Sequence, residues 1–212
     1  MPPPMVHLAI AVEMYGVDHN SDFLLGNIAP DAIHMRPNTK RKDKLRVHLA
    51  DLPKQRYERA RQLFTQYRVD NYGSKEIEFA DGYITHLLTD FLWQERVIKL
   101  FYEQVPPSLT HHERRKLYYQ ETDGNDFNLY HQMPWREAVW TKLSETIPWY
   151  FGPFLTSDEI SKWRDRVLKW FEDIEEPKIE PIFISYEKTL NFINQASSEI
   201  KSVLEDWKSF ID

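Results

Sequence analysis

The sequence contains the stretch Phe79-Ala-Asp-Gly-Tyr-Ile-Thr-His-Leu-Leu-Thr-Asp-Phe-Leu-Trp93, in which His86 and Asp90 are four positions apart. On an α-helix this spacing places both side chains on one face, with their Cβ atoms roughly 6 Å apart. An imidazole nitrogen and a carboxylate oxygen held in this way can bind one divalent cation. Because the flanking residues are mostly apolar, the stretch predicts a buried helix whose two polar side chains need partners. A hydrogen bond between the two side chains in an ordinary core is the alternative.

Further residues with metal-binding side chains come earlier, each in or beside an apolar segment. His7 lies within Met5-Val-His-Leu-Ala-Ile-Ala-Val-Glu-Met14, and His48 lies within Leu45-Arg-Val-His-Leu-Ala50. Asp31 follows a proline that can begin a helix, and His34 comes one turn later. Taken singly, each is better explained as a core or surface residue. The ordered series is not explained by packing alone, and it predicts one metal cluster formed by His7, Asp31, His48, His86 and Asp90.

This ordered set resembles the bacterial zinc-dependent phospholipase C family, which is distantly related to the fungal single-strand nucleases. The short sequence motifs are also similar: a His-Leu near the N-terminus, an Ala-x-Asp ending at Asp31, and a Gly-Tyr-x-x-His-Leu-x-x-Asp followed by Trp93. The resemblance covers roughly residues 5–93 and fades beyond about residue 130. It implies an all-α, multi-helix phospholipase C/nuclease-like bundle that holds zinc and hydrolyses phosphate esters.

The resemblance also implies roles for individual residues. In the family, one metal ion takes the ligands equivalent to Asp31, His48, His86 and Asp90. A second ion shares the carboxylate equivalent to Asp90 with the first, and it also uses the equivalent of His7 and the mature N-terminal residue. All of these ligands are nitrogen or oxygen donors, which bind zinc but can also bind manganese, iron or nickel.

The family's third ion uses a histidine soon after the HxxxD word and then a His-x-x-x-Glu word. Here Arg96 stands near the first position, and the later word reads Leu117-Tyr-Tyr-Gln-Glu121. Both histidines are missing, so we expect one or two ions. The family's secreted members expose an N-terminal tryptophan, whereas this chain begins Met-Pro-Pro-Pro without the pattern of a signal peptide. Together with the absence of cysteine, this start favours a cytoplasmic protein.

Several other residues are expected to support the site. Asp31 or Glu121 could orient a water molecule or accept its proton, and Glu121 could instead be a ligand. His34 and Tyr83 are expected beside the ligands, and Asp123-Gly124 is typical of a turn. Less specific candidates for the surroundings of the site are Asp81, Trp93 and His131.

Composition limits the remaining possibilities. The 212 residues suit one domain, with residues 5–130 as the metal-site core and residues 131–212 as a Trp-rich helical extension. The tryptophans of the extension are expected to pack between helices, with a lipid or carbohydrate platform as the alternative. A net charge of −6 argues against broad nucleic-acid binding. The basic run Lys40-Arg-Lys-Asp-Lys-Leu-Arg46 is either a solvated face or a rim that attracts an anionic substrate.

Periodicity and capping residues predict a helical chain without a transmembrane segment. The expected helices cover residues 5–15, 22–27, 31–35, 41–50, 55–69, 75–104, 109–130, 134–144, 157–173 and 183–209. The last helix is expected to pack on the bundle or on a second subunit of a homodimer. The leading function is metal-dependent hydrolysis of a small phosphodiester or phosphomonoester, and the alternative is a catalytically weak metal-binding scaffold. A phosphohydrolase of the HD type is disfavoured, because the adjacent pair His111-His112 is followed by Glu113.

Overall fold

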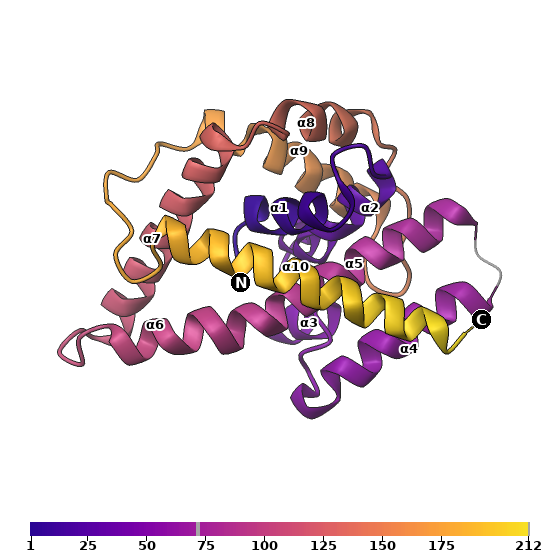
Figure 1. The fold of residues 1–212 in the computed structure, drawn as a ribbon, viewed down its shortest axis with the longest axis horizontal. Helices are drawn as coiled ribbons and strands as arrows, with labels where there is room; N and C mark the ends of the chain where they lie inside the picture. The colour runs from indigo at the N-terminus through magenta and orange to yellow at the C-terminus, as the bar shows by residue number, and fades with distance from the viewer. Residues whose placement is uncertain (71–72, 212) are drawn as a thin grey trace.

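A computed structural model describes residues 1–70 and 73–211 (Figure 1). The predicted all-α fold is confirmed: in these residues the only β pairing is an isolated bridge between Phe151 and Leu155. None of the helices in the described residues combines the length and apolar character needed to cross a bilayer. The α-helices are α1 (Pro4–Tyr15), α2 (Ser21–Ile28), α3 (Arg41–Val47), α4 (Arg56–Val69), α5 (Ser74–Trp93), α6 (Lys99–Gln104), α7 (His111–Gln132), α8 (Arg136–Glu145), α9 (Ser157–Asp173) and α10 (Tyr186–Ser209). Two 3₁₀ segments, η1 (Ala29–Met35) and η2 (Pro53–Gln55), and a π-helix, η3 (Gln94–Ile98), complete the chain.

The structure shortens two of the predicted helices. The helix expected over residues 41–50 ends at Val47, because Leu49 has a left-handed φ of 50° that a helix cannot continue through. The last helix begins at Tyr186, where the Ser185 side chain accepts the N–H of Lys188 as an N-cap. The helix expected over residues 75–104 is continuous, but it passes through the π-helix η3.

Helix α5 lies at the centre of the bundle and carries His86 and Asp90. It packs against α1, α2, α4, η1 and α10, and Figure 1 shows α10 crossing the molecule in front of these helices. Helix α1 is buried continuously from Met5 to Ala11 and again at Met14. An α-helix that is apolar and buried all round belongs to the interior, so the imidazole of His7 lies away from bulk water.

Helices α2 and α5 approach each other through two glycines, Gly26 and Gly82. A Cβ added at Gly82 would lie 2.0 Å from the carbonyl oxygen of Phe23 and 2.8 Å from the backbone nitrogen of Asn27. A Cβ at Gly26 would lie 2.1 Å from the carbonyl oxygen of Phe79. Both contacts are with backbone atoms, which cannot move aside cheaply. This close approach brings the backbone of Asn27 against His86.

Replacing Gly82 by alanine is expected to destabilise the protein by about 2–3 kcal/mol, because the new methyl group overpacks a rigid backbone contact. Urea unfolding of the variant would measure the loss. Gly124→Ala is the matched control, since Gly124 is also inside a helix but its Cβ would lie 3.3 Å from the Pro181 side chain and 3.7 Å from the nearest backbone atom, the carbonyl oxygen of Ile179. Equal losses for the two variants would contradict the proposed role of the α2–α5 contact.

Segment η1 is tied to α9 by Arg36. Its Nε donates to Glu159 Oε1 over 2.6 Å, and Nη2 donates to the carbonyl oxygen of Phe154 over 2.8 Å. This pairing fixes η1, which carries Asp31 and His34, against a helix from the second half of the chain.

Candidate metal centre

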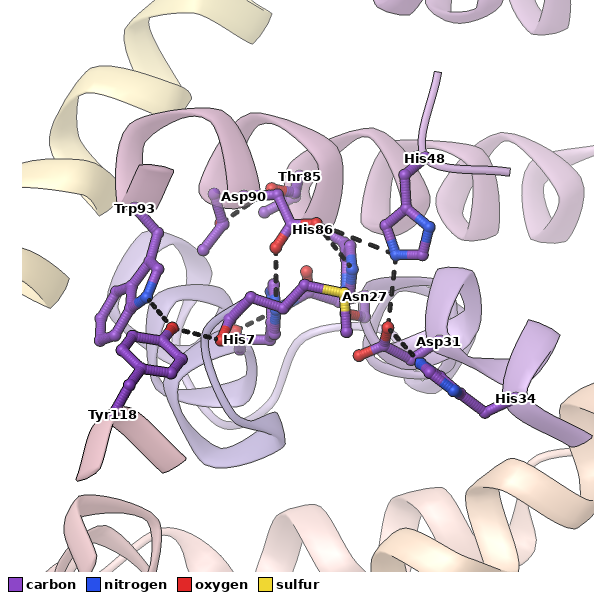
Figure 2. Close-up of polar contacts among 12 residues, drawn as sticks. His7, Asn27, Asp31, His34, His48, Thr85, His86, Asp90, Trp93 and Tyr118 are labelled. Atoms are coloured by element: carbon purple, nitrogen blue, oxygen red, sulfur yellow. Dashed lines mark hydrogen bonds and ion pairs between the residues drawn. The ribbon is translucent and has the colours of Figure 1, made fainter. Parts of the chain in front are cut away.

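The structure brings together the side chains that the sequence placed in one cluster (Figure 2). Asp90 is the common neighbour of three histidines. Its Oδ1 lies 3.9 Å from His7 Nε2, and its Oδ2 lies 3.8 Å from both His48 Nε2 and His86 Nε2. Asp31 Oδ1 lies 3.3 Å from His48 Nε2. These side chains come from α1, η1, the end of α3 and α5, although up to 83 positions separate them, from His7 to Asp90.

The cluster contains two overlapping groups of possible ligand atoms. One consists of His7, His86 and Asp90, and the other of Asp31, His48 and His86; within each group the atoms lie within 4.8 Å of one another. The contacts of 3.8–3.9 Å around Asp90 are too long for hydrogen bonds. Asp90 is therefore not joined directly to the three histidines, and there is room for an ion between its oxygens and their nitrogens.

Buried polar atoms without partners support the presence of an ion. Four atoms are buried and have no hydrogen-bond partner among the described residues: His7 Nδ1 and Nε2, His86 Nε2 and Asp90 Oδ1. A buried polar atom left unpaired costs free energy, so such atoms rarely remain without a ligand. Imidazole nitrogen and carboxylate oxygen are also the donors that zinc accepts. The residues present thus fit a zinc ion.

The rings of His48 and His86 are oriented by backbone carbonyl groups. His86 Nδ1 donates to the carbonyl oxygen of Asn27 over 2.9 Å, and His48 Nδ1 donates to that of Lys44 over 3.0 Å. A carbonyl oxygen can only accept, so both Nδ1 atoms carry the proton and both Nε2 atoms face the cluster. This is the arrangement in which a second group fixes the tautomer of a metal-binding histidine.

Asn27 and Tyr83 hold the backbone around the cluster. The Asn27 side-chain amide donates to the carbonyl oxygen of His7 over 2.6 Å, so Asn27 joins α1 to α5 through its side chain and its backbone. The Tyr83 hydroxyl donates to the carbonyl oxygen of Val47, next to His48. Tyr83 was predicted to lie beside the cluster, and its hydroxyl contacts the residue that precedes His48.

Burial controls the protonation of two of the histidines. It lowers the pKa of His7 well below its ordinary value, and the neighbouring His86 lowers it further. Burial also lowers the pKa of His86, against the opposing effect of Asp90. The two rings are stacked with centroids 3.8 Å apart. Both imidazoles are therefore neutral at pH 7, which is the state that binds metal.

Asp31 and His48 form a pair with opposite shifts. Burial alone would raise the pKa of Asp31, but the His48 hydrogen bond and the nearby histidines hold it below its ordinary value. Burial alone would lower the pKa of His48, but Asp31 and Asp90 together raise it. Without a metal ion, Asp31 is therefore an ionised carboxylate, and the neighbouring His48 readily holds a proton on both ring nitrogens.

His34 lies at the edge of the cluster and outside both groups of ligand atoms. Its Nδ1 lies 3.0 Å from Lys44 Nζ, and its Nε2 lies 3.9 Å from Asp31 Oδ1. Because an ammonium group only donates, Nδ1 must be the accepting nitrogen, and Nε2 carries the proton. His34 therefore presents an N–H group toward Asp31 and is not a metal donor in this arrangement.

Glu121 does not lie with the other predicted residues. Its carboxylate is buried and accepts the backbone N–H groups of Ile182, Phe183 and Ile184, at 2.7–3.2 Å. It therefore holds the connection to α10 instead of facing the metal centre. At 3.6 residues per turn, Glu121 lies about 160° around α7 from Asp123, which does face the centre. The expectation that Glu121 is a ligand or catalytic base is therefore wrong.

Two of the three less specific candidates, Asp81 and His131, also lie elsewhere, whereas Trp93 lies at the edge of the cluster (Figure 2). Asp81 pairs with Arg68, His131 pairs with Glu176 on the surface, and the Trp93 indole donates to the Tyr118 hydroxyl. Arg96, at the position of the missing histidine, pairs with Glu199 at 2.6 Å.

A cavity of about 610 Å³ opens directly onto the cluster. Asp31, His48 and Asp90 form part of its wall, and α9 contributes Trp163 and Trp170. The tryptophans of the second half were expected to pack between helices, with a lipid or carbohydrate platform as the alternative, and these two reach the cavity. Sequence alone did not single out these two, because their position depends on how α9 packs against η1.

Helix α7 contributes two acidic residues to the cavity wall, Asp123 and Asp126. The predicted turn at Asp123-Gly124 is wrong, because α7 runs through it and places the two aspartates one turn apart. Burial raises the pKa of Asp123 to about 6. It raises the pKa of Asp126 well above its ordinary value, although Asp126 accepts the N–H of Met5 over 2.8 Å.

Comparison with known proteins agrees with this geometry. The model of the family described as zinc dependent phospholipase C matches residues 6–133, a range that includes every side chain of the cluster. No curated protein and no solved structure matches the chain. The match covers more than half of the 212 residues and confirms the resemblance predicted from the ordered histidines and aspartates. The chain belongs to the zinc-dependent phospholipase C family.

Proposed function

We propose that this protein is a zinc-dependent hydrolase of small phosphodiesters. Membership of the family implies metal-dependent phosphodiester hydrolysis. The observation that carries the proposal is the group of unpartnered, buried donor atoms on His7, His86 and Asp90, next to a cavity large enough for a small substrate. Zinc bound there would polarise the phosphoryl oxygens and lower the pKa of water.

The two oxygens of Asp90 support a shared carboxylate. Oδ2 faces His48 and His86, whereas Oδ1 faces His7. We propose that one ion is held by Asp31, His48, His86 and Asp90. A second, weaker ion would be held by His7 and the other oxygen of Asp90. His86 can serve only one ion, since its Nδ1 is bonded to Asn27.

The remaining residues supply positioning and proton transfer. The described contacts of Asp31 use Oδ1, which leaves Oδ2 to accept a hydrogen bond from the attacking water. Asp123 lines the cavity and, with its pKa near 6, is partly protonated close to neutrality. It can therefore donate a proton to the leaving oxygen. We also propose that residues 131–212 belong to the same domain, since α9 supplies part of the cavity wall.

The proposal is tested with protein purified without a histidine tag and loaded with zinc. Metal content is measured by mass spectrometry, and turnover is measured on a panel of phosphodiesters and phosphomonoesters. We expect one or two zinc ions per chain and faster turnover of diesters than of monoesters. Bound zinc without turnover of any ester would instead support the metal-binding scaffold, and no bound zinc would contradict both functions.

A further inference from the structure

Three cationic side chains line the metal-site cavity without a carboxylate partner. They are Arg41, Lys44 and Arg56, and none of them forms an ion pair within the described residues. Nearby arginines behave differently: Arg36 pairs with Glu159 and Arg59 pairs with Asp51. The chain carries a net charge of −6, so positive groups beside the site are not a consequence of a basic protein. Cations that lack a carboxylate partner and line the cavity beside the cluster indicate a negatively charged ligand.

Two of the three groups, Lys44 and Arg56, have contacts that position them, whereas Arg41 is exposed at the start of α3. Arg41 and Lys44 are three residues apart on α3, and both side chains line the cavity. The ammonium of Lys44 lies 3.0 Å from His34 Nδ1, and the other nitrogen of that ring lies 3.9 Å from Asp31. One imidazole ring therefore separates Lys44 from the metal cluster. The guanidinium of Arg56 stacks over the Phe91 ring, 4.4 Å from its centroid.

We propose that Arg41, Lys44 and Arg56 form a subsite for a second anionic group of the substrate. This inference rests on the proposed function, in which the ester phosphate occupies the metal centre. The substrate class is then a phosphodiester that carries a further phosphate close to the scissile one. Arginine and lysine form strong charge-assisted hydrogen bonds with phosphate oxygens. The acidic residues Asp123 and Asp126 come from α7, and within the described residues neither forms an ion pair with the three cations on α3 and α4.

The test uses binding, which does not depend on turnover. The affinity of the zinc-loaded protein is measured by calorimetry for two matched pairs of product-like ligands. Inositol 1-phosphate and inositol 1,4-bisphosphate represent a lipid headgroup, and thymidine 5′-phosphate and thymidine 3′,5′-bisphosphate represent a nucleotide. We expect the bisphosphate of at least one pair to bind about tenfold more tightly or better, since one charge-assisted contact is sufficient for that ratio. The pair that shows the preference identifies the source of the second phosphate.

The double variant Arg41→Gln/Lys44→Gln is expected to reduce this ratio to within about twofold, and Arg56→Gln to reduce it partly. Lys42→Gln/Arg46→Gln is the matched control, because it removes the same charge from the exposed remainder of α3 and should keep the ratio. Equal binding of the mono- and bisphosphates in both pairs, or an undiminished ratio in Arg41→Gln/Lys44→Gln, would overturn the subsite. If the preference is found but no ester is hydrolysed, the subsite stands and only the hydrolase function fails.

Discussion

Replacing Asp90 by asparagine is expected to lower phosphodiester turnover by at least about 10²–10³-fold, the loss typical of one well-placed electrostatic group. The substitution keeps the shape of the side chain but removes its negative charge and introduces N–H donors. Asp90 is the carboxylate that lies within 3.9 Å of nitrogen atoms on His7, His48 and His86. Without it, three imidazoles converge on a site with only Asp31 to balance the charge of an ion.

Zinc content should fall together with turnover. If Asp90 is shared by two ions, the variant should retain fewer zinc ions per chain than the parent, as measured by mass spectrometry. Glu95→Gln is the control, since it removes the same charge from an exposed position five residues later in η3. Parent-like turnover in Asp90→Asn would exclude Asp90 from the metal centre, whatever its zinc content.

The residues of the cluster could be predicted from sequence because metal chemistry restricts which residue types can form such a site. Only a few residue types bind zinc, and the HxxxD spacing already places His86 and Asp90 on one face of α5. The apolar segments around His7 and His48 indicated that these side chains point inward. The order of the series then gave the family, and the structure brings the same residues together.

The residues around the ligands could not be predicted in the same way. Asn27 matters through its backbone carbonyl as much as through its side chain, and its position depends on the contact of Gly26 and Gly82 between α2 and α5. A sequence does not reveal which carbonyl group will meet a histidine from another helix.

Glu121 shows that a partial match to a family motif can mislead. It aligns with the last residue of a His-x-x-x-Glu motif whose histidine is missing in this chain. In the structure Glu121 instead accepts the backbone N–H groups of Ile182–Ile184. Asp123 and Asp126 were obscured because Asp-Gly is common in turns. Their spacing of three residues was the signal that could have placed them on one helical face.

Zinc is expected to raise the free energy of unfolding at pH 7.5 by about 3–4 kcal/mol when its free concentration is 100–1,000 times the dissociation constant. The buried, unpartnered nitrogens of His7 and His86 are costly without an ion, and an ion bound only by the folded protein stabilises it. Thermal or urea unfolding with zinc and with chelator would measure the difference. His131→Gln, which changes an exposed histidine outside the cluster, should leave the difference unchanged.

The stabilisation by zinc should disappear on acidification, and the pKa shifts define the direction. Burial lowers the pKa of His7 and His86 in the folded protein. Below about pH 6.5, the ordinary value, the unfolded chain therefore binds more protons at these positions, so stability falls as the pH falls. His48 has the opposite sign, because its raised pKa favours the protonated folded state and its contribution is lost as the pH rises. Protons compete with zinc for all three histidines, so acidification removes the ion and the stabilisation that it provides. His48 must lose its second proton to bind zinc. Calorimetry of zinc binding in buffers of different ionisation enthalpy should therefore detect proton release near neutral pH. The variant His48→Gln should remove this proton release. Equal unfolding with zinc and with chelator at pH 7.5 would exclude a structural role for the ion.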